Sequence, residues 1–398
     1  MIDVRVLIVS WEYPPIVEGG LARHVRKLAE GLADAGADVC VLTRGAGDTP
    51  VEEERGGVRV RRVLHTRAPR DLDAFLAWVD RMNDDLAARG RELLDERSFD
   101  VVHGHDWLVA EAACALARAA GVPYVTTIHA TEHGRHQGWV AEHPQSHIHG
   151  VETWMAHAAD HVIACSHYMR AHVADVFGLP DARIAVIPNG IDPGDLRPVG
   201  DLARLRRRFA EPGERLVLLA GRLVYEKGFQ DALDALRALT RRRDDVRFVV
   251  AGSGPHEAAL REQARRLGIA PRGAFLGWIG DDLLHSLYRV ADVCIVPSIY
   301  EPFGLVALEA MASGCACLAA DVGGLREVVP HRDAGLRFRA RSPRSLSHWL
   351  GRVLDDDELR RALVAEAREH VRAFDWADVA RRTAGVYGQL VAARAPAA

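Results

Sequence analysis

Short apolar runs alternate along the chain with longer segments in which apolar positions recur every three or four residues. The first run, Val4–Val9, has the length of a buried strand, and the segment Leu21–Ala35 has the period of an amphipathic helix. A second short run follows at Val39–Leu42. Strands that alternate with helices are typical of parallel sheets joined by crossover helices. The beginning of the chain therefore predicts a doubly wound α/β domain.

The same alternation continues through the first half and restarts after residue 212. The further strands expected in the first half are Val101–Val102, Tyr124–Ile128, His161–Ala164 and Ile184–Ile187. Those expected in the second half are Arg215–Ala220, Val246–Ala251, Ala274–Leu276, Val293–Val296 and Cys317–Ala319. Between the halves, the stretch from Asn189 to Gly200 is dense in turn-forming residues and indicates a linker. Two such domains would bring the carboxyl ends of both sheets to one cleft.

Length, charge and cysteine content narrow the class of protein. A chain of 398 residues is long enough for two domains, and its formal net charge of −4 does not favour binding to nucleic acid. No apolar run approaches the ~20 residues of a membrane span, and the start of the chain lacks the features of a signal peptide. The six cysteines lie mostly in apolar runs and are expected to be reduced, as in a cytoplasmic protein. The turn-rich, acidic segment Gly45–Gly57 is expected to be a surface loop.

Paired glycines stand between the first expected strand and the first expected helix. Gly19 and Gly20 would let backbone N–H groups approach a ligand closely, and a helix N-terminus adds partial positive charge. Both features suit a phosphate group. The string is not GxGxxG, which disfavours an ordinary nicotinamide site. A glycine turn needed only for chain reversal is the alternative.

Histidines end two further strands of the first half. The string His103-Gly-His-Asp-Trp107 places two histidines on the same side of an extended segment, but a metal site would need a third ligand. A polar patch lining the cleft is therefore the prediction here, with a satisfied structural cluster as the alternative. His129 ends the next strand and would face the cleft. Most of the histidines from His133 to His149 are expected in a loop.

Two fixed cations follow the first expected strand of the second half. Arg222 and Lys227 stand in the string Gly221-Arg-Leu-Val-Tyr-Glu-Lys-Gly228, just before a helix. A diphosphate leaving group carries concentrated negative charge, which preplaced cations stabilise as it develops. Arginine offers a rigid fork and lysine a point charge for this purpose. A solvated charged turn is the alternative.

The most specific string is Glu301-Pro-Phe-Gly-Leu-Val-Ala-Leu-Glu309. Glu301 lies in a loop, and Glu309 lies in the expected helix Leu305–Ala312. The loop Phe303–Leu305 opens that helix, where unpaired backbone N–H groups can bind an anion or a hydroxyl-rich ligand. Two carboxylates can accept hydrogen bonds from hydroxyl groups at the two ends of a nucleotide sugar. An exposed acidic cap with a glutamate on a helix face is the alternative.

Other catalytic signatures are missing from the sequence. It contains neither the GxSxG string of serine hydrolases nor a Walker A string. Two DxD strings, Asp71–Asp73 and Asp355–Asp357, stand in polar, helix-start surroundings that favour a solvated role. No metal bound to a donor diphosphate is therefore predicted, and no cofactor.

Taken together, these strings resemble the GT-B-fold, family 4 glycosyltransferases related to bacterial glycogen synthases. The resemblance covers nearly the whole chain and also includes Pro188-Asn-Gly-Ile-Asp192 and the closing Phe374-Asp-Trp376. The strings Ser10-Trp-Glu-Tyr-Pro-Pro15 and Gly134-Arg-His-Gln-Gly-Trp139 are similar to actinobacterial α-1,4-glucosyltransferases of glycogen and methylglucose lipopolysaccharide synthesis.

The resemblance implies an architecture with two Rossmann-like domains facing a central cleft. The implied acceptor-binding domain covers residues 1–192, and the nucleotide-sugar-binding domain covers residues 193–372. Residues 373–398 would form a C-terminal helix that crosses back to the first domain.

The resemblance also implies a role for each matching residue. The donor diphosphate would be held by Gly19, Gly20, Arg222 and Lys227. The transferred sugar would be bound by His129, Glu301 and the backbone of Phe303, Gly304 and Leu305, and the ribose by Glu309. His105, Asp106 and Trp107 would shape the acceptor side. The implied catalytic set is His129, Arg222, Lys227 and Glu301.

The implied reaction is retaining transfer of a hexose, with glucose expected, from UDP-glucose or ADP-glucose to a glucan or glycoside, forming α-1,4 links. In this family the leaving phosphate is thought to take the acceptor proton during front-face substitution. One alternative is a transferase of the same fold that moves GlcNAc or mannose to a small or lipid acceptor. Others are donor hydrolysis or epimerisation, and a pyridoxal-phosphate phosphorylase, for which no motif is present. A non-enzymatic alternative is an inert protein that binds sugar nucleotides or glucans.

Overall fold

The computed structural model describes residues 4–69 and 71–394. The chain divides into two compact units, Met1–Gly190 with Asp375–Ala398, and Ile191–Phe374. The domain boundaries expected from the sequence lie within two residues of these divisions. The two units are described separately below.

An eight-stranded sheet forms the centre of the first unit. Its strands are β1 Arg5–Ser10, β2 Asp38–Gly45, β3 Glu52–Arg55, β4 Val58–Leu64, β5 Val101–His105, β6 Tyr124–Ile128, β7 His161–Ala164 and β8 Ile184–Val186. The order across the sheet is β3-β4-β2-β1-β5-β6-β7-β8, and only β3 runs antiparallel to its neighbour. Every strand expected in the first half is present.

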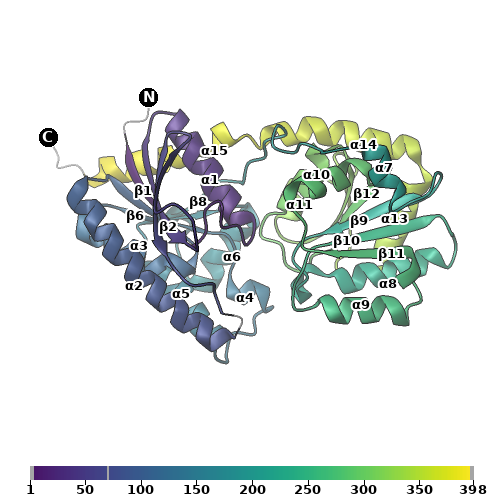
Figure 1. The fold of residues 1–398 in the computed structure, drawn as a ribbon, viewed down its shortest axis with the longest axis horizontal. Coiled ribbons are helices and arrows are strands. Elements are labelled where there is room, and N and C mark those ends of the chain that lie inside the picture. The colour runs from purple at the N-terminus through teal and green to yellow at the C-terminus, as the bar shows by residue number, and fades with distance from the viewer. Residues whose placement is uncertain (1–3, 70, 395–398) are drawn as a thin grey trace. The chain divides into compact units, whose positions relative to one another are not determined.

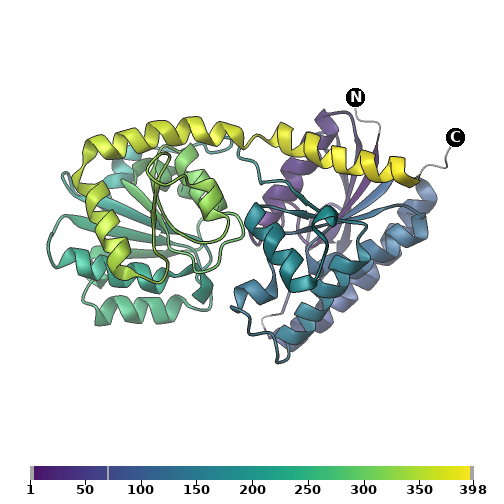
Figure 2. The ribbon, with the colours of Figure 1, turned by 180° about the vertical axis from the view of Figure 1, so that it is seen from behind.

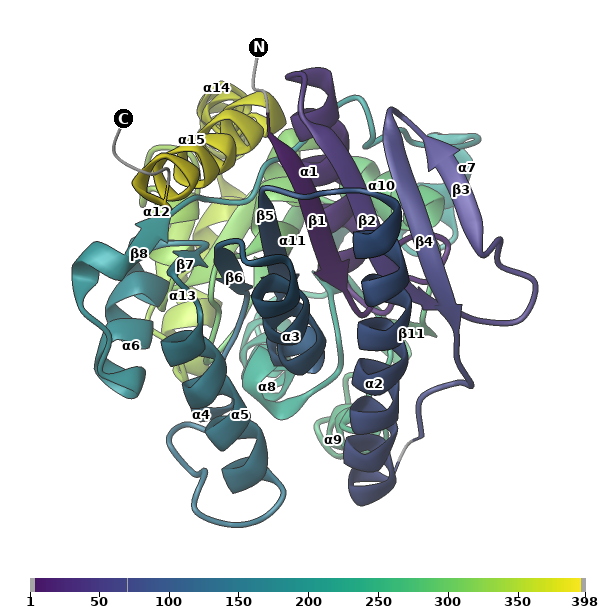
Figure 3. The ribbon, with the colours of Figure 1, turned by 90° about the vertical axis from the view of Figure 1, so that its left-hand side faces the viewer.

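Helices cover both faces of this sheet. They are α1 Gly20–Asp34, α2 Leu72–Glu96, α3 Ala110–Ala120, α4 Glu132–Arg135, α5 Gln145–Ala158, α6 His167–Phe177 and α15 Trp376–Arg394, with 3-10 turns η1 Trp107–Val109 and η2 Asp181–Arg183. Figure 3 shows α2, α3 and α5 on one face of the sheet, and α1 packs beside α15. The chain thus returns to the first unit for its last helix, as the resemblance implied.

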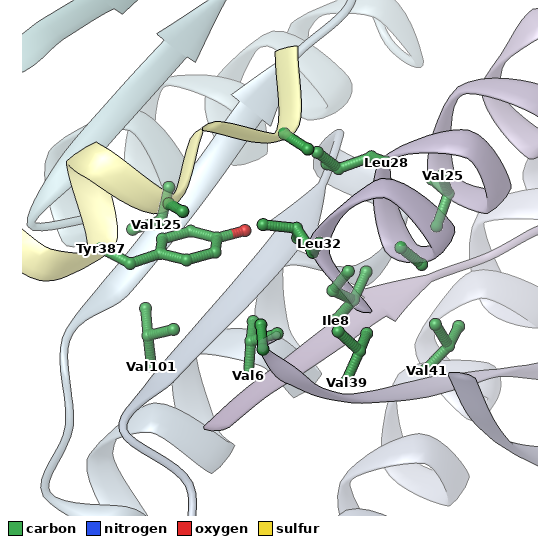
Figure 4. Close-up of a cluster of buried hydrophobic side chains, with 14 of the residues drawn as sticks. Val6, Ile8, Val25, Leu28, Leu32, Val39, Val41, Val101, Val125 and Tyr387 are labelled. Atoms are coloured by element: carbon green, nitrogen blue, oxygen red, sulfur yellow. The ribbon is translucent and has the colours of Figure 1, made fainter. Parts of the chain in front are cut away.

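The packing of α15 explains why the C-terminal segment belongs to the first unit. Tyr387 is fully buried, and Figure 4 shows its ring among Val101, Val125 and Leu32. Its hydroxyl meets Nδ1 of His103 at 2.6 Å. Burying an aromatic side chain of this size is worth about 1.5–3 kcal/mol relative to exposure. The last helix is therefore part of the first unit's core.

Two local expectations about the first unit were wrong. The expected loop Gly45–Gly57 contains β3, which pairs with β4 at the edge of the sheet because acidic side chains on β3 face arginines on β4. Glu53 accepts from Arg62 at 2.8 Å across this pair. The expected histidine-rich loop is partly helical, since His133 lies on α4 and both His147 and His149 lie on α5.

The second unit contains a six-stranded, wholly parallel sheet. Its strands are β9 Arg215–Ala220, β10 Val246–Ala251, β11 Gly273–Gly277, β12 Val293–Val296, β13 Ala316–Ala320 and β14 Leu336–Phe338. They lie in the order β11-β10-β9-β12-β13-β14. Counted within the unit this is 3-2-1-4-5-6, the order of a dinucleotide-binding Rossmann fold. The expected doubly wound second domain is confirmed.

Helices pack on both faces of this sheet as well. They are α7 Leu202–Arg207, α8 Phe229–Thr240, α9 Glu257–Arg266, α10 Asp281–Val290, α11 Leu305–Ala312, α12 Leu325–Val328, α13 Pro343–Asp355 and α14 Asp357–His370, with turns η3 Tyr225–Lys227, η4 Ala270–Arg272 and η5 Val371–Ala373. Helix α8 packs against α9 and α13, while α10 and α11 lie together across the sheet (Figures 1 and 2). Among the described helices, none combines the length and apolar character needed to cross a membrane.

Both DxD strings begin helices. The Asp71 side chain accepts from the Ala74 N–H at 2.9 Å at the start of α2. Asp356 accepts from the Leu359 N–H at 2.9 Å at the start of α14. N-terminal caps of this kind satisfy backbone donors that the helix leaves unpaired. Asp71 and Asp356 therefore act as helix N-caps.

Candidate active site

Each sheet has one point where the strand order reverses direction. In the first unit it lies between β1 and β5, and in the second between β9 and β12. Ligands of open α/β sheets bind outside the carboxyl ends of the strands at such points. The predicted site residues follow these very strands, apart from His129, which follows the neighbouring β6. The topology therefore collects most of them at two strand edges, one in each unit.

A close backbone approach brings the loops after β9 and β12 together. Gly228 ends the η3 turn with φ 69°, and a Cβ there would lie 2.0 Å from the Pro297 carbonyl oxygen. Only glycine permits both that conformation and that contact. The Ile299 N–H also donates to the Glu226 carbonyl at 2.8 Å. The loop that carries Lys227 is therefore fixed against the loop that carries Glu301.

Lys227 and Glu301 form an ion pair across these loops. The Lys227 Nζ lies 2.8 Å from the Glu301 Oε2, and the Ser298 hydroxyl donates to the same oxygen at 2.8 Å. The lysine side chain is 23% exposed and the glutamate side chain 12%. A partly solvated pair of this kind holds both charges in place while one face stays accessible. Arg222 lies in the same loop, directly after Gly221.

The start of α11 has the shape that the sequence predicted. Gly304 has φ 116°, a conformation that favours glycine, and Leu305 begins the helix. Phe303 is buried and packs on Phe374, with ring centroids 5.9 Å apart. The Gly324 N–H donates to the Glu301 carbonyl at 2.9 Å. These contacts hold the helix N-terminus, with its partial positive charge, beside the Glu301 loop.

Glu309 lies one turn further along α11 and is 7% exposed. The Tyr288 hydroxyl, from α10, donates to its Oε2 at 3.1 Å. Sequence reasoning missed Tyr288 and Ser298, because a tyrosine in an amphipathic helix and a serine in a loop carry no distinguishing pattern. Both orient the two carboxylates of the Glu301–Glu309 string.

In the first unit, a carboxylate already occupies the N–H groups before α1. Glu12 Oε2 accepts from the backbone N–H groups of Glu18 and of Gly19, the latter at 3.2 Å. Burial raises the Glu12 pKa, and these two N–H groups oppose that rise. The N–H groups before α1 therefore bind a carboxyl oxygen of the chain itself, and a donor phosphate at Gly19 and Gly20 stays a prediction.

Replacing Gly19 by alanine tests whether a ligand approaches this turn. Gly19 has extended φ, −167°, and a Cβ there would meet no described atom within 4 Å. We therefore expect Gly19→Ala to fold with an unchanged melting temperature and to raise the donor KM about tenfold, which is ~1.4 kcal/mol. Donor titration and calorimetry measure the two effects. Unchanged KM in a folded variant would contradict a donor contact at Gly19.

His129 follows β6 and is held by two neighbours. Its backbone N–H donates to Asp106 Oδ1 at 2.7 Å, and its Nε2 lies 3.1 Å from Nδ1 of His105. Burial lowers the His129 pKa to about 3. The imidazole is therefore neutral at physiological pH. It is suited to a hydrogen bond with a sugar hydroxyl and not to stabilising a negative charge as a cation.

The three residues predicted for the acceptor side lie behind His129. The side chains of His105, Asp106 and Trp107 are all buried. Asp106 has φ 62°, rare for a residue other than glycine, and burial raises its pKa to about 6. A strained, buried aspartate that binds the backbone of a site residue fits a positioning role. The predicted role of His105, Asp106 and Trp107 on the acceptor side stays a prediction.

Further buried polar residues surround this histidine and escaped the sequence interpretation. His24, on α1, lies with its ring centroid 4.6 Å from that of His129. Glu152, on α5, accepts from the Glu132 N–H with both oxygens at 2.9 Å, and burial raises its pKa to about 8. Glu152 lies at the helical spacing of the buried positions Ile148 and Met155 on α5. This spacing was the signal in the sequence that could have identified it as inward-facing. His24 had the same signal, since it lies four residues before the buried Leu28 on α1.

The buried histidines predict an acid-sensitive first unit. Burial holds the pKa values of His24, His103, His105 and His129 below the ordinary value of 6.5. The unfolded chain therefore binds more protons than the folded unit below about pH 6.5, and stability falls as pH falls. The raised pKa values of three buried carboxyls, Glu12, Asp106 and Glu152, act in the opposite direction but are outnumbered.

We expect the first unit to melt several degrees lower at pH 5.5 than at pH 7.5. Calorimetry gives the melting temperatures, and hydrogen exchange assigns the change to the first unit. A melting temperature that stays constant or rises on acidification would contradict neutral buried imidazoles.

Comparison with known proteins gives an independent view of these residues. Residues 18–195 match the family described as Glycosyltransferase Family 4, and residues 203–370 match Glycosyl transferases group 1. The chain is 40% identical over 399 residues to a glycogen synthase of Mycobacterium tuberculosis, covering 96% of this chain and 94% of that protein. It is 34% identical to a D-inositol 3-phosphate glycosyltransferase of Acidothermus cellulolyticus, covering 96% and 88% of the two chains.

Solved structures agree on the fold. Sucrose-phosphate synthase from Thermosynechococcus elongatus superposes with a TM-score of 0.83 at 26% identity, covering 98% of this chain and all of that one. The catalytic domain of starch synthase IV from Arabidopsis thaliana, solved with ADP and acarbose, gives a TM-score of 0.76 at 19% identity, with 98% and 100% coverage. The two Rossmann-like units, the matched families and these relatives lead to one conclusion: the chain belongs to family 4 of the GT-B glycosyltransferases.

Proposed function

We propose that this glycosyltransferase moves a glucosyl residue from UDP-glucose or ADP-glucose to an α-glucan, with retention of configuration and formation of α-1,4 links. The observation that carries the proposal is the Lys227–Glu301 pair at the β9–β12 switch point. One charge suits the leaving diphosphate, and the other suits sugar hydroxyls. The relative named glycogen synthase, at 40% identity, supports glucose and a glucan acceptor.

The donor would bind along the carboxyl edge of the second unit's sheet. Lys227 and Arg222 would hold the diphosphate, while Glu301 would accept from the sugar's 3- and 4-hydroxyls. The start of α11 would supply backbone N–H groups, and Glu309, oriented by Tyr288, would accept from the ribose hydroxyls. Gly19, Gly20 and His129, all in the first unit, would be further contacts of the donor.

Retention in this proposal proceeds by front-face substitution. A double displacement would need a carboxylate nucleophile close to the anomeric carbon on the face opposite the leaving group. Glu301 is committed to Lys227 and Ser298, which suits binding of hydroxyls better than nucleophilic attack. The leaving phosphate would accept the proton of the attacking hydroxyl. The protein would contribute orientation and charge stabilisation.

A donor and acceptor panel tests the proposal. The protein is incubated with UDP-glucose and with ADP-glucose, each with and without a maltooligosaccharide, and products are read by mass spectrometry. Extension of the oligosaccharide by single hexoses is the expected result. Nucleotide release without an acceptor would indicate hydrolysis, and donor binding without turnover would indicate an inert binding protein.

A second candidate function has support of its own. Relatives named D-inositol 3-phosphate glycosyltransferase reach 34% identity over 96% of the chain. A sugar such as GlcNAc or mannose would then move to a small phosphorylated or lipid acceptor. Adding UDP-GlcNAc, GDP-mannose and inositol phosphate to the same panel separates this function from glucan extension. The cytoplasmic location expected from the cysteines is part of either proposal.

Transfer should not need a divalent metal on the donor. In this proposal the cations of Lys227 and Arg222 take the place of a metal ion at the diphosphate, and the DxD aspartates cap helices. We expect the initial rate in excess EDTA to equal or exceed the rate in magnesium buffer. Loss of turnover with EDTA that magnesium restores would contradict this part of the proposal.

A further inference from the structure

A cluster of four imidazoles, three buried and one partly buried, lies at the switch point of the first unit. It joins His24 from α1, His103 and His105 from β5, and His129 after β6. The ring centroids of His24 lie 4.6 Å from His129 and 5.4 Å from His105, and those of His105 and His129 are 5.4 Å apart. The cluster thus draws on three different elements of one unit.

Hydrogen bonding separates one member from the other three. His103 has both ring nitrogens occupied, by the Tyr387 hydroxyl at 2.6 Å and the Thr127 hydroxyl at 2.7 Å. By contrast, three ring nitrogens have no hydrogen-bond partner among residues 4–69 and 71–394. They are both nitrogens of His24 and the Nε2 of His105. The Asn189 amide lies beside His24 without reaching hydrogen-bond geometry. Buried polar atoms without a partner destabilise the folded state, so their presence calls for an explanation.

We propose that His24, His105 and His129 form a binding site for a zinc ion. One ring nitrogen from each residue lies within 4.8 Å of the other two. Zinc–nitrogen bonds of about 2.0–2.1 Å place two tetrahedral ligands about 3.3 Å apart. The His105 Nδ1 and the His129 Nε2 are already separated by 3.1 Å. The longest pair would have to close by about 1.5 Å at most, which is within reach of side-chain rotation.

The chemical state of the three rings suits zinc. Neutral imidazole is the form that binds zinc, and the rings of His24 and His105 are buried in the unit. His129 is only partly buried, so an ion can enter from its side. Three histidine ligands leave a fourth position for water or for a hydroxyl. The sequence could not show this site, because the string from His103 to Trp107 supplies one of the three ligands.

This zinc site is distinct from the proposed diphosphate site of the second unit. There Lys227 and Arg222 take the place of a metal ion. Zinc at the cluster would join α1, β5 and the segment after β6 within the first unit. An ion that binds only the folded unit stabilises it, by an amount that grows with the logarithm of the zinc concentration relative to Kd. The inference therefore concerns metal binding and stability, and it holds or fails whether or not the proposed transfer reaction is correct.

Metal stoichiometry on the full chain, without an affinity tag, tests the site. The protein is stripped with a chelator, titrated with zinc by calorimetry, and analysed for bound metal after gel filtration. We expect one zinc per chain, a melting temperature raised by several degrees, and visible absorption of a four- or five-coordinate ion when cobalt replaces zinc.

Matched histidine variants locate the ion. His24→Asn and His129→Asn each remove one ligand and should abolish stoichiometric binding and the cobalt absorption. His133→Asn is the control, because His133 belongs to another histidine group, with its ring 5.6 Å from that of His172 and 6.1 Å from that of His149. Circular dichroism tests whether each variant is folded. If His24→Asn is not folded, His129→Asn alone provides the ligand-removal test.

Two results would overturn the proposal. One is zinc bound at less than a tenth of stoichiometric occupancy by the stripped wild-type chain in zinc excess. The other is stoichiometric binding that survives in the folded His129→Asn variant or disappears in His133→Asn.

Discussion

Lys227→Met is expected to lower kcat by a factor of about 10²–10³. Removing one preplaced group that stabilises developing charge costs about 2.7–4 kcal/mol in comparable sites. Lys227 meets that description, because its Nζ is fixed 2.8 Å from Glu301 and its loop is fixed through Gly228. Methionine keeps most of the apolar stem, so the melting temperature should change little. Steady-state kinetics with saturating donor measures the effect.

The chain offers a matched control for this variant. It contains only two lysines, Lys27 and Lys227. Lys27→Met, on α1, should leave kcat within about twofold. The same scarcity allows a direct binding assay, since bound donor should protect Lys227 but not Lys27 from reductive methylation followed by mass spectrometry. A folded Lys227→Met enzyme with near-normal kcat would disprove the leaving-group role.

Glu301→Gln is expected to lower kcat/KM for the donor by about 100-fold, or ~2.7 kcal/mol. The substitution keeps the shape and removes the charge that accepts from Ser298 and pairs with Lys227. Sugar hydroxyls would then meet a weaker acceptor, and Lys227 would lose its fixed position. Charge-assisted hydrogen bonds are about twice as strong as neutral ones, which supports a loss of this size. Donor titrations at saturating acceptor measure kcat and KM separately.

Glu262→Gln, on α9, is the control. The Glu262 side chain is 52% exposed, so this variant should have the kinetics of the wild type. The double variant Lys227→Met with Glu301→Gln tests the pair itself. Residues that share one interaction give less than the product of their separate effects. If the two effects multiply fully, the residues act independently and the ion pair is incidental to catalysis.

The sequence predicted the frame of the fold and most of the residues at its strand ends. Buried parallel strands such as Leu216–Leu219 are continuous apolar runs, which stand out without any knowledge of tertiary contacts. The strand Val58–Leu64 was missed because its arginines interrupt the apolar alternation, although Arg62 is buried by its pairing with Glu53. A strand such as β4, which carries arginines that pair with the edge strand β3, has a weaker hydrophobic signal than the central strands.

Contacts between residues far apart in the chain could not be predicted from the sequence. Lys227 and Glu301 were assigned to separate parts of a ligand, and only the structure shows that they hold each other across 74 residues. His24 is the clearest case, because on α1 it occupies an ordinary inward-facing position of an amphipathic helix. Its meeting with His105 and His129 depends on how α1 packs at the reversal between β1 and β5.

The stereochemistry of the product tests the central claim most directly. UDP-glucose or ADP-glucose, both α-linked, is supplied with a maltooligosaccharide, and the anomeric proton of the new linkage is followed by NMR. The account predicts a new α-1,4-glucosyl unit that forms in the presence of EDTA and almost disappears in Lys227→Met. A β-linked product, or transfer that is unaffected by loss of Lys227, would contradict it.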